Sequence, residues 1–343
     1  MLYIRTDANK IIATGHVMRC LTVANEVKRL GCDVTFVVSD EGSELLIRDN
    51  NYPVLNMNSD WKNPCERHEW DQLSEKIEDN DVMLIDSYQI SDEYYTEMRK
   101  HFKLACFDDM FERKYNADII INYNMYHYLF DYSKRYTTEK LLIGTSYTPI
   151  REQFKEYYSS SRIINKGRKK VLLICGGGDY LNSMYRILEY IIRMDNTLFS
   201  SLDWRVVAGR YNPNKDKLLK LQNEHQNIKV YSNVSNMALL MQGCDICISA
   251  ASTVLYECCI MKLPTVFYCV ADNQKFESEG FALDNMMLYA GDYLSNAIET
   301  LEMIIKNLNM IVNDDVLYCN MIEKMGKIID CDGAKRIAKV LVY

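Results

Sequence analysis

Short apolar runs alternate along most of the chain with segments whose apolar positions recur at helical spacing. Residues 34–38 and 82–85 are continuous and apolar, which is typical of strands covered on both faces. Residues 17–30 show helical spacing, and Gly31 is placed to end that helix. The alternation predicts an α/β fold with parallel sheets and right-handed crossovers. Strands are predicted at residues 2–5, 33–38, 82–85, 103–107, 118–121, 170–175, 204–208, 228–231, 245–249 and 265–268.

The strand and helix units form two halves of similar size. A length of 343 residues suits about two domains of ~100–200 residues each. The polar segment 159–168 separates the halves and is the predicted linker. We therefore expect doubly wound domains over residues 1–158 and 169–328, facing each other across a cleft, with ligands beyond the carboxyl ends of strands. Residues 273–343 are expected to be mostly helical.

Composition narrows the class of protein. The net charge is -7 and no long run of Lys or Arg offsets it, which argues against binding nucleic acid or acidic membranes in general. Met1 is followed directly by a predicted strand, and no segment reaches the ~18–20 apolar residues of a membrane span. We therefore expect a cytoplasmic protein without stable membrane insertion. The 12 Cys are expected to be reduced, with Cys244 and Cys247 structural although they form a C-x-x-C.

The first candidate site lies between strand 2–5 and the helix that follows it. Arg5 and Asp7 come at the end of the strand, and Gly15 and His16 begin the helix. A helix N-terminus presents unpaired N–H groups to an anion, and His can transfer a proton near neutral pH. These parts predict a phosphate or sugar-phosphate site. The alternative is that Gly15 permits a turn and His16 caps the helix.

The second half carries two further candidate sites. Strand 170–175 ends in Gly176, Gly177 and Gly178, whose backbone N–H groups could approach an anion closely. This is neither G-x-G-x-x-G nor a Walker loop, and the alternative is a plain turn. After strand 245–249, small residues lead into Ser252 and Thr253 at a helix start that we expect to be capped and to seat a diphosphate. Glu257, one turn on, could accept ribose hydroxyls or could be an ordinary solvated side chain.

Other acidic groups also follow predicted strands. They are Asp86-Ser87-Tyr88, Asp108-Asp109 and Asp272-Asn273-Gln274. An acid pair can bind a metal or cap a helix, and no third ligand stands at a fixed spacing, so no metal site is predicted.

These motifs resemble, in collinear order over nearly the whole chain, those of the UDP-sugar hydrolases of pseudaminic acid biosynthesis and the related spore-coat polysaccharide proteins. The resemblance implies a GT-B-like fold of two Rossmann-type domains with a UDP-sugar between them, related to MurG-type glycosyltransferases. The terminal segment 329–343 would then be a helix that packs back on the N-terminal domain. The matching segments are Arg5-Thr6-Asp7, Gly15-His16-Val17-Met18-Arg19-Cys20-Leu21, Asp86-Ser87-Tyr88, Phe107-Asp108-Asp109, Tyr147 with Ile150-Arg151-Glu152-Gln153-Phe154, Gly176-Gly177-Gly178-Asp179, Ala250-Ala251-Ser252-Thr253 with Glu257-Cys258-Cys259, Leu263-Pro264 and Asn273-Gln274.

The resemblance also implies roles for individual residues. His16 would be the catalytic histidine, Tyr88 and Asn273 would line the sugar side, and no cofactor or metal would take part. The substrate-binding residues would be Arg5, Asp7, Gly15, Tyr88, Asn273 and Gln274, and the UDP-binding residues Gly176, Gly177, Gly178, Ser252, Thr253 and Glu257.

The chain departs from the family pattern at three positions where the family usually has glycine. They are Ala13, Ala251 and Lys262. Ala13 and Ala251 would narrow the loops that approach the phosphates, which bears on the identity of the sugar more than on the nucleotide.

The predicted function is hydrolysis of a UDP-linked diacetamido-trideoxy sugar at its anomeric carbon, with release of UDP, in pseudaminic-type acid or surface polysaccharide biosynthesis. His16 would act as general base on water and the reaction would invert the anomeric centre. A glycosyltransferase that uses the same UDP site is the first alternative. A binding module for nucleotide sugars without activity is the second.

Overall fold

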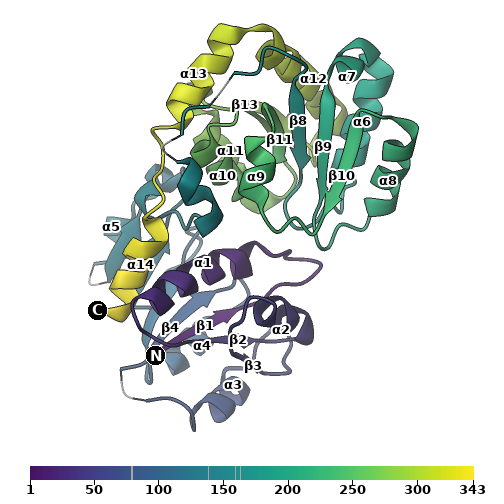
Figure 1. Cartoon of the computed structure of the whole chain (residues 1–343). Helices are drawn as coiled ribbons and strands as arrows, with labels where there is room; N and C mark the ends of the chain where they lie inside the picture. Colours follow the sequence, from purple (N-terminus) through teal and green to yellow (C-terminus); the bar gives the residue numbers. More distant parts are fainter. Residues whose placement is uncertain (79, 138, 159, 163) are drawn as a thin grey trace. The chain divides into compact units, whose positions relative to one another are not determined.

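The computed structural model describes residues 1–343 except residues 79, 138, 159 and 163, and its chain divides into two compact units (Figure 1). Unit 1 consists of Met1–Arg151 and Asp332–Tyr343. Unit 2 consists of Glu152–Cys331. The chain thus passes into unit 2 ahead of the predicted boundary at residue 158. Two positions of the predicted linker, 159 and 163, lie outside the described residues.

Unit 1 is built on a parallel sheet of seven strands within its described residues, in the order β3-β2-β1-β4-β5-β6-β7. The chain starts in the middle at β1, builds one side, and returns to the middle at β4, which is doubly wound topology. The strands are β1 (Leu2–Thr6), β2 (Val34–Val38), β3 (Val54–Asn56), β4 (Val82–Asp86), β5 (Lys103–Phe107), β6 (Ile119–Asn122) and β7 (Lys140–Ile143). The helices are α1 (Gly15–Arg29), α2 (Glu41–Arg48), α3 (Glu66–Leu73), α4 (Asp92–Met98), α5 (Tyr132–Arg135) and α14 (Gly333–Val342).

Unit 2 repeats this plan with six parallel strands among its described residues, in the order β10-β9-β8-β11-β12-β13. The strands are β8 (Lys170–Ile174), β9 (Asp203–Ala208), β10 (Ile228–Ser232), β11 (Ile246–Ala250), β12 (Thr265–Cys269) and β13 (Leu288–Asp292). The helices are α6 (Ser183–Met194), α7 (Asn196–Ser201), α8 (Lys215–Glu224), α9 (Met237–Gln242), α10 (Val254–Met261), α11 (Lys275–Ala282), α12 (Ala297–Asn313) and α13 (Asp315–Met325). The prediction of two doubly wound α/β sheets is confirmed.

Buried apolar side chains explain why these strands form. In β4 and β12 every residue is buried, as expected for strands covered by helices on both faces. Gly31 follows α1 with φ +82 and donates its N–H to Lys28, so the predicted helix stop is confirmed. The expectation that residues 273–343 are mostly helical is confirmed, with the addition of one strand, β13, which pairs with β12.

The last helix, α14, belongs to unit 1 and packs against α1 (Figure 1). Its apolar face is buried at Ala334, Ile337, Ala338 and Leu341. Gly333 begins the helix where a Cβ atom would lie 2.6 Å from the backbone nitrogen of Thr148, so only glycine fits this approach. The chain therefore contributes its first and last helices to the same unit.

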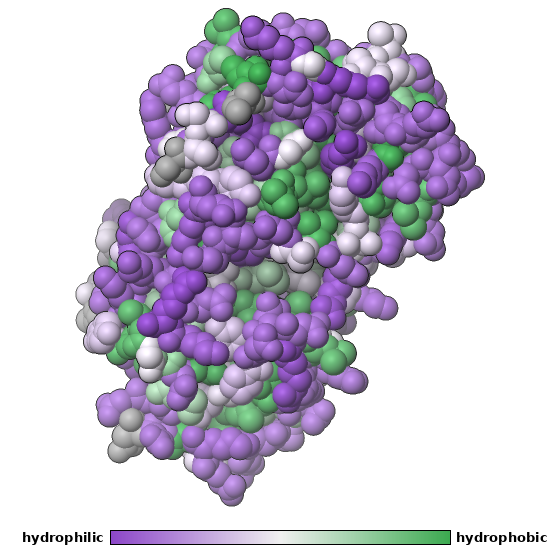
Figure 2. Space-filling model, viewed as in Figure 1, coloured by the Kyte–Doolittle hydropathy of each residue, from purple (hydrophilic) through white to green (hydrophobic). Residues whose placement is uncertain are grey.

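The surface is mostly hydrophilic on the face shown in Figure 2, where the apolar areas are interrupted by polar ones. In the part of the chain that the structure describes, no helix combines the length and apolarity needed to cross a bilayer.

Candidate active site

In unit 1, the neighbouring strands β1 and β4 mark the point where the chain switches from one side of the sheet to the other. Open α/β sheets bind ligands beyond the carboxyl ends of strands at such a point. The register pairs Thr6, the last residue of β1, with Asp86, the last residue of β4. Side chains that follow these two strands are therefore brought together.

The chain from β1 to α1 is a tight loop. The Asn9 side chain accepts hydrogen bonds from the backbone N–H groups of Ile11 and Ile12, and Ala13 has φ +57. Thr14 occupies the N-cap of α1 but makes no side-chain hydrogen bond there. A Cβ atom on Gly15 would meet no atom within 4 Å, so space is open at the start of the helix.

His16 forms a close pair with Asp86. Its Nδ1 lies 2.6 Å from Oδ1 of Asp86, so the side chain does not cap the helix. Burial alone would raise the pKa of Asp86, but Arg19 and His16 hold this pKa far below its usual range. Because the carboxyl group is ionised, the proton between the two atoms belongs to Nδ1. In the neutral ring, the other nitrogen, Nε2, then carries a lone pair and can accept a proton.

Arg19 lies at the centre of this cluster. Its Nε and Nη2 bond to the two oxygens of Asp86 at 2.6 and 2.5 Å, and Nη2 also bonds to Oδ2 of Asp109 at 2.8 Å. Its Nη1 donates to the hydroxyl of Tyr123 at 3.0 Å, and its guanidinium stacks over Phe107. Burial favours a neutral arginine, but the two carboxylates raise its pKa well above the ordinary value. Arg19 is therefore a fixed positive charge between two buried negative ones.

Tyr88 is held by the second carboxylate. Its hydroxyl donates to Oδ2 of Asp109 at 2.8 Å, and its ring meets that of His16 edge to face with centroids 4.8 Å apart. Asn124 donates to the other oxygen of Asp109 at 2.9 Å. Burial and the neighbouring charge of Asp109 raise the pKa of Tyr88 well above its usual value, so the phenol keeps its proton.

Arg5 and Asp7 form a separate buried network. Arg5 bonds to both oxygens of Glu69, at 2.9 and 3.0 Å, and to Asp7 at 2.6 Å, and its side chain is fully buried. Asp7 also accepts the backbone N–H of Ser39 at 2.7 Å. The structure therefore uses both side chains to hold the ends of β1 and β2. Their predicted substrate contact stays a prediction.

In unit 2, the equivalent switch point lies between β8 and β11. The glycine loop follows β8, and Gly176 has φ +58, which favours glycine. A Cβ atom on Gly176 would lie 4.0 Å from Oγ of Ser252, which follows β11, so the structure brings these two predicted residues together. Gly209, after β9, touches the backbone of the same loop: its Cβ would lie 2.7 Å from the carbonyl carbon of Gly177.

Two helices begin at this edge, and they differ in how their first backbone N–H groups are bonded. The buried carboxylate of Asp179 accepts the backbone N–H groups of Ser183 and Met184 at 2.8 and 3.0 Å, so the start of α6 already holds a negative group. Thr253 at the N-cap of α10 makes no side-chain hydrogen bond, which corrects the predicted capped start. Oγ of Ser252 is buried and has no hydrogen-bond partner among the described residues. The start of α10 is thus the better place for an anion.

The remaining predicted residues also lie in unit 2. Glu257 is half-buried one turn into α10. Asn273 is exposed in the short helical turn Asp272–Gln274 after β12. Gln274 accepts the backbone N–H of Val270 at 2.9 Å and so closes that turn.

Sequence reasoning missed the roles of Arg19 and Asp109 and the pairing of Asp86 with His16. A usable signal was present, because Arg19 stands three residues after His16 and therefore shares its helix face. Asp86 and Asp109 were identified only as acidic residues at strand ends. Nothing local in the sequence shows that one arginine contacts both.

The C-x-x-C of unit 2 does not form a reactive pair. Cys244 follows α9 and Cys247 lies within β11, and both are free and buried. Burial raises the pKa of Cys244 to about 12 and that of Cys247 well above its ordinary value.

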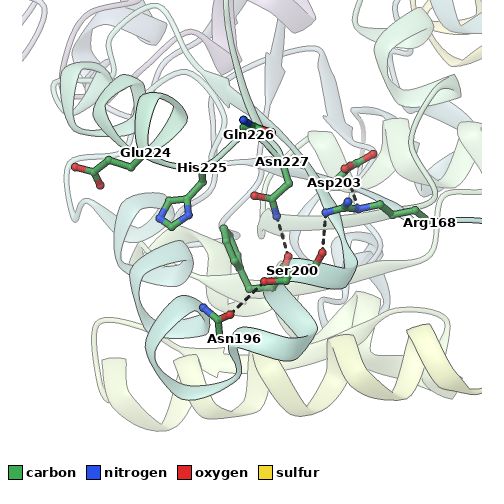
Figure 3. A pocket seen from close by; sticks show the side chains of 9 residues that line it. Arg168, Asn196, Ser200, Asp203, Glu224, His225, Gln226 and Asn227 are labelled. Carbon is green, nitrogen blue, oxygen red and sulfur yellow. Dashed lines mark hydrogen bonds and ion pairs between the residues drawn. The ribbon is translucent and has the colours of Figure 1, made fainter.

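A depression of about 520 Å³ lies at the opposite, amino edge of the unit 2 sheet (Figure 3). Its polar groups bond to one another and to the chain. Arg168 pairs with Asp203 at 3.0 Å, and Asn227 donates to the backbone carbonyl groups of Phe199 and Leu202. The polar side chains of this depression therefore hold the neighbouring loops in place.

Comparison with solved structures defines the fold class as GT-B, as expected from the resemblance. Acinetobacter baumannii MurG has a TM-score of 0.65 at 12% identity over 99% of both chains. The spinosyn rhamnosyltransferase SpnG has a TM-score of 0.68 at 9% identity over the whole of both chains. At these identities the likeness shows the fold alone.

Curated relatives confirm the resemblance to UDP-sugar hydrolases. A UDP-2,4-diacetamido-2,4,6-trideoxy-beta-L-altropyranose hydrolase of Campylobacter jejuni is 29% identical over 79% of this chain and 92% of its own. A Helicobacter pylori protein that joins this hydrolase to a pseudaminic acid cytidylyltransferase is 26% identical over 86% of this chain. An uncharacterized protein of Methanocaldococcus jannaschii is 27% identical over 76% of it. The chain spans about half the length of these last two relatives, 50% and 54%. No family model matches the chain.

Proposed function

We propose that this protein hydrolyses a UDP-linked diacetamido-trideoxy sugar at the anomeric carbon and releases UDP. The observation that carries the proposal is the His16–Asp86 pair at the switch point of unit 1, because it leaves Nε2 of His16 as a base. The names of the Campylobacter and Helicobacter relatives supply the substrate class.

In the proposed reaction, Nε2 of His16 takes one proton from a water molecule while the water oxygen attacks the anomeric carbon. The bond from that carbon to the phosphate oxygen breaks, and UDP leaves with the electron pair. The products are the free sugar, with inverted configuration, and UDP. A base positioned in this way contributes roughly 10²–10⁴-fold to the rate.

Unit 2 is proposed to bind the nucleotide. The backbone N–H groups of Gly176–Gly178 and the start of α10 at Ser252 and Thr253 would bind the diphosphate, and Glu257 would accept the ribose hydroxyls. The unused hydroxyl of Ser252 and the open start of α10 support this assignment. Asn273 and Gln274 are proposed to contact the substrate from the same unit.

The second candidate is a GT-B glycosyltransferase, in which an acceptor hydroxyl replaces water. The GT-B fold of the solved relatives favours it. A module that binds nucleotide sugars without turnover is the least supported, because the His16–Asp86 pair is intact.

The test is an assay of UDP release from UDP-2,4-diacetamido-2,4,6-trideoxy sugars, with UDP-N-acetylglucosamine as the control substrate and no acceptor present. We expect equimolar UDP and free sugar from the diacetamido substrate, and a loss of at least about 100-fold in His16→Gln. Release that depends strictly on an added acceptor would favour the transferase, and UDP-sugar binding without turnover would favour the binding module.

A further inference from the structure

The cluster in unit 1 fixes the positions of two protons. A chain of four contacts runs through Nη2 of Arg19: His16 Nδ1 to Asp86 Oδ1 at 2.6 Å, Asp86 to Arg19 at 2.5 Å, Arg19 to Asp109 Oδ2 at 2.8 Å, and Asp109 to Tyr88 Oη at 2.8 Å. Asp86 therefore accepts two bonds from Arg19 and Asp109 accepts one, and each carboxylate also bonds to one ring, that of His16 or of Tyr88.

The first proton lies on Nδ1 of His16. Nη2 of Arg19 is 3.2 Å from this nitrogen, but its two hydrogens already bond to Asp86 and Asp109. The 2.6 Å contact with an ionised Asp86 requires a donor, so Nδ1 donates, and in the neutral ring Nε2 accepts.

The second proton lies between Tyr88 and Asp109. Oδ1 of Asp109 accepts a hydrogen bond from Asn124, and Oδ2 accepts from Arg19 and Tyr88. In each of these bonds the carboxylate is the acceptor and its partner is the donor. The hydroxyl proton of Tyr88 is therefore used in the hydrogen bond to Asp109. Toward any ligand, the phenol oxygen can only accept a hydrogen bond.

The two rings are more exposed to solvent than the charged side chains that orient them. The side chains of Arg19, Asp86 and Asp109 are 7, 1 and 5% exposed, whereas that of His16 is 13% exposed and Tyr88 is half-buried. The two adjacent rings are thus more exposed than the charged side chains, and each ring carries a hydrogen-bond acceptor.

We propose that Nε2 of His16 and the hydroxyl oxygen of Tyr88 form a paired-acceptor site that selects water over an alcohol as the nucleophile, with Arg19 and Asp109 as its positioning residues. The inference rests on the proposed hydrolysis. A water molecule has two O–H protons and can satisfy both acceptors, with a lone pair left for the anomeric carbon. An alcohol has one O–H proton and leaves one acceptor without a partner, which disfavours it by roughly 10-fold or more.

In the reaction that this site favours, the water proton on the His16 side moves to Nε2 as the carbon–oxygen bond forms. The proton on the Tyr88 side stays on the new hydroxyl group of the sugar. UDP leaves with the electron pair of the broken bond. No further reactant is needed.

The test measures how the products divide when UDP-sugar hydrolysis runs in aqueous methanol. The ratio of methyl glycoside to free sugar does not depend on how much of a preparation is folded. Wild type is expected to give almost only free sugar. Tyr88→Phe removes the second acceptor and should raise the ratio at least about 10-fold. Asp109→Asn should raise it too, because an amide N–H can turn the phenol into a donor.

Tyr52→Phe and Asp118→Asn are the matched controls, since they remove a hydroxyl bonded to Asn25 and a carboxylate bonded to Arg99 elsewhere in unit 1. Both should leave the ratio unchanged. An unchanged ratio in Tyr88→Phe and Asp109→Asn, with UDP still released, would overturn the inference but not the proposed hydrolysis.

A second measurement needs no substrate. Long-range proton–nitrogen NMR at neutral or higher pH, with His16→Gln to assign the signals, reports which nitrogen of His16 carries the proton. The Nδ1–H form is expected. The Nε2–H form would overturn the paired-acceptor site even if no UDP-sugar were hydrolysed.

Discussion

At the β1/β4 junction of unit 1 the chain places His16, Arg19 and Asp86, whereas at the β8/β11 junction of unit 2 it places Gly176 and Ser252. The two sheets share the same doubly wound order at their centres. The junction in unit 1 is filled with charged side chains that bond to one another. The junction in unit 2 is lined by backbone and small side chains. The same topology therefore carries a cluster of charged side chains in one unit and a backbone-lined junction in the other.

The starts of the helices show the same contrast. At α6 the carboxylate of Asp179 bonds to the first N–H groups, while at α10 the N-cap residue Thr253 makes no capping bond with its side chain. In unit 1, α1 begins at Gly15 with open space and carries His16 one position later. A helix N-terminus is thus a site only where the chain leaves it uncapped.

The largest effect is expected from breaking the charged junction. In Asp86→Asn, the amide can donate to Nδ1 and favour the tautomer in which Nε2 carries the proton and cannot act as a base. We expect kcat for UDP release to fall by roughly 10²–10⁴-fold with UDP affinity unchanged. Asp118→Asn is the control, and wild-type turnover in Asp86→Asn would contradict the assigned pairing.

The junction in unit 2 should be disrupted by a steric clash with its backbone instead. Gly209→Ala would place Cβ 2.7 Å from Gly177, so the glycine loop must shift. We expect UDP affinity to fall by about 10-fold or more and the free energy of unfolding to fall by about 1–3 kcal/mol. Gly15→Ala is the matched control, because its Cβ meets nothing within 4 Å and its unfolding free energy should not fall. Calorimetry with UDP and urea unfolding measure both quantities, and full UDP affinity in Gly209→Ala would count against the loop.

Unit 1 should also show a pH dependence of stability at Asp108. Burial, followed by the charge of Asp109, raises the pKa of Asp108 to about 6, although hydrogen bonds from Phe111 and Tyr136 oppose the shift. Its unfolded value is about 3.9, so between about pH 4 and pH 6 the native state binds more protons. The free energy of unfolding therefore falls as pH rises through this window, by about 2–3 kcal/mol in total.

Asp108→Asn removes this titration. The stability of the variant relative to wild type should increase from pH 4 to pH 7 by about the same 2–3 kcal/mol, measured by urea unfolding at each pH. Asp118→Asn serves as the control at a partly exposed carboxylate. A stability difference that does not change with pH would contradict the buried, protonated Asp108.

The smallest effects concern the three departures from glycine. Ala13 and Lys262 have φ +57 and +50, so both occupy the left-handed region that glycine favours, whereas Ala251 does not. Glycine at 13 or 262 should raise the free energy of unfolding by up to about 1 kcal/mol, while Ala251→Gly should lower it by about 1 kcal/mol. Thermal unfolding distinguishes these signs, and equal effects at all three positions would contradict the backbone geometry.

Much of this fold could be predicted because buried parallel strands have continuous apolar sequences. The strands that were missed, β3, β7 and β13, all lie at sheet edges. An edge strand has one neighbour and less buried surface, so its sequence is shorter or more polar, as in Val54–Asn56. The alternation of apolar runs with helical patterns therefore did not indicate these three strands.

The site was predicted in part for a related reason. His16, the glycine loop and Ser252 are recognisable because their residue types are unusual in those positions of the chain. Arg19 and Asp109 are 90 positions apart, and their contact depends on the strand order. Spacing within one element cannot show a contact made across a sheet.

The central claim, that unit 1 performs the chemistry and unit 2 binds the nucleotide, is tested most directly by measuring UDP affinity and single-turnover UDP release in His16→Gln and Ser252→Ala together. We predict that His16→Gln loses about 10²–10⁴-fold in rate and keeps its UDP affinity. Ser252→Ala should lose about 3–10-fold in UDP affinity without loss of stability, because its buried hydroxyl has no partner among the described residues. If instead His16→Gln weakens UDP binding while Ser252→Ala leaves it intact, the division of roles between the two units is wrong.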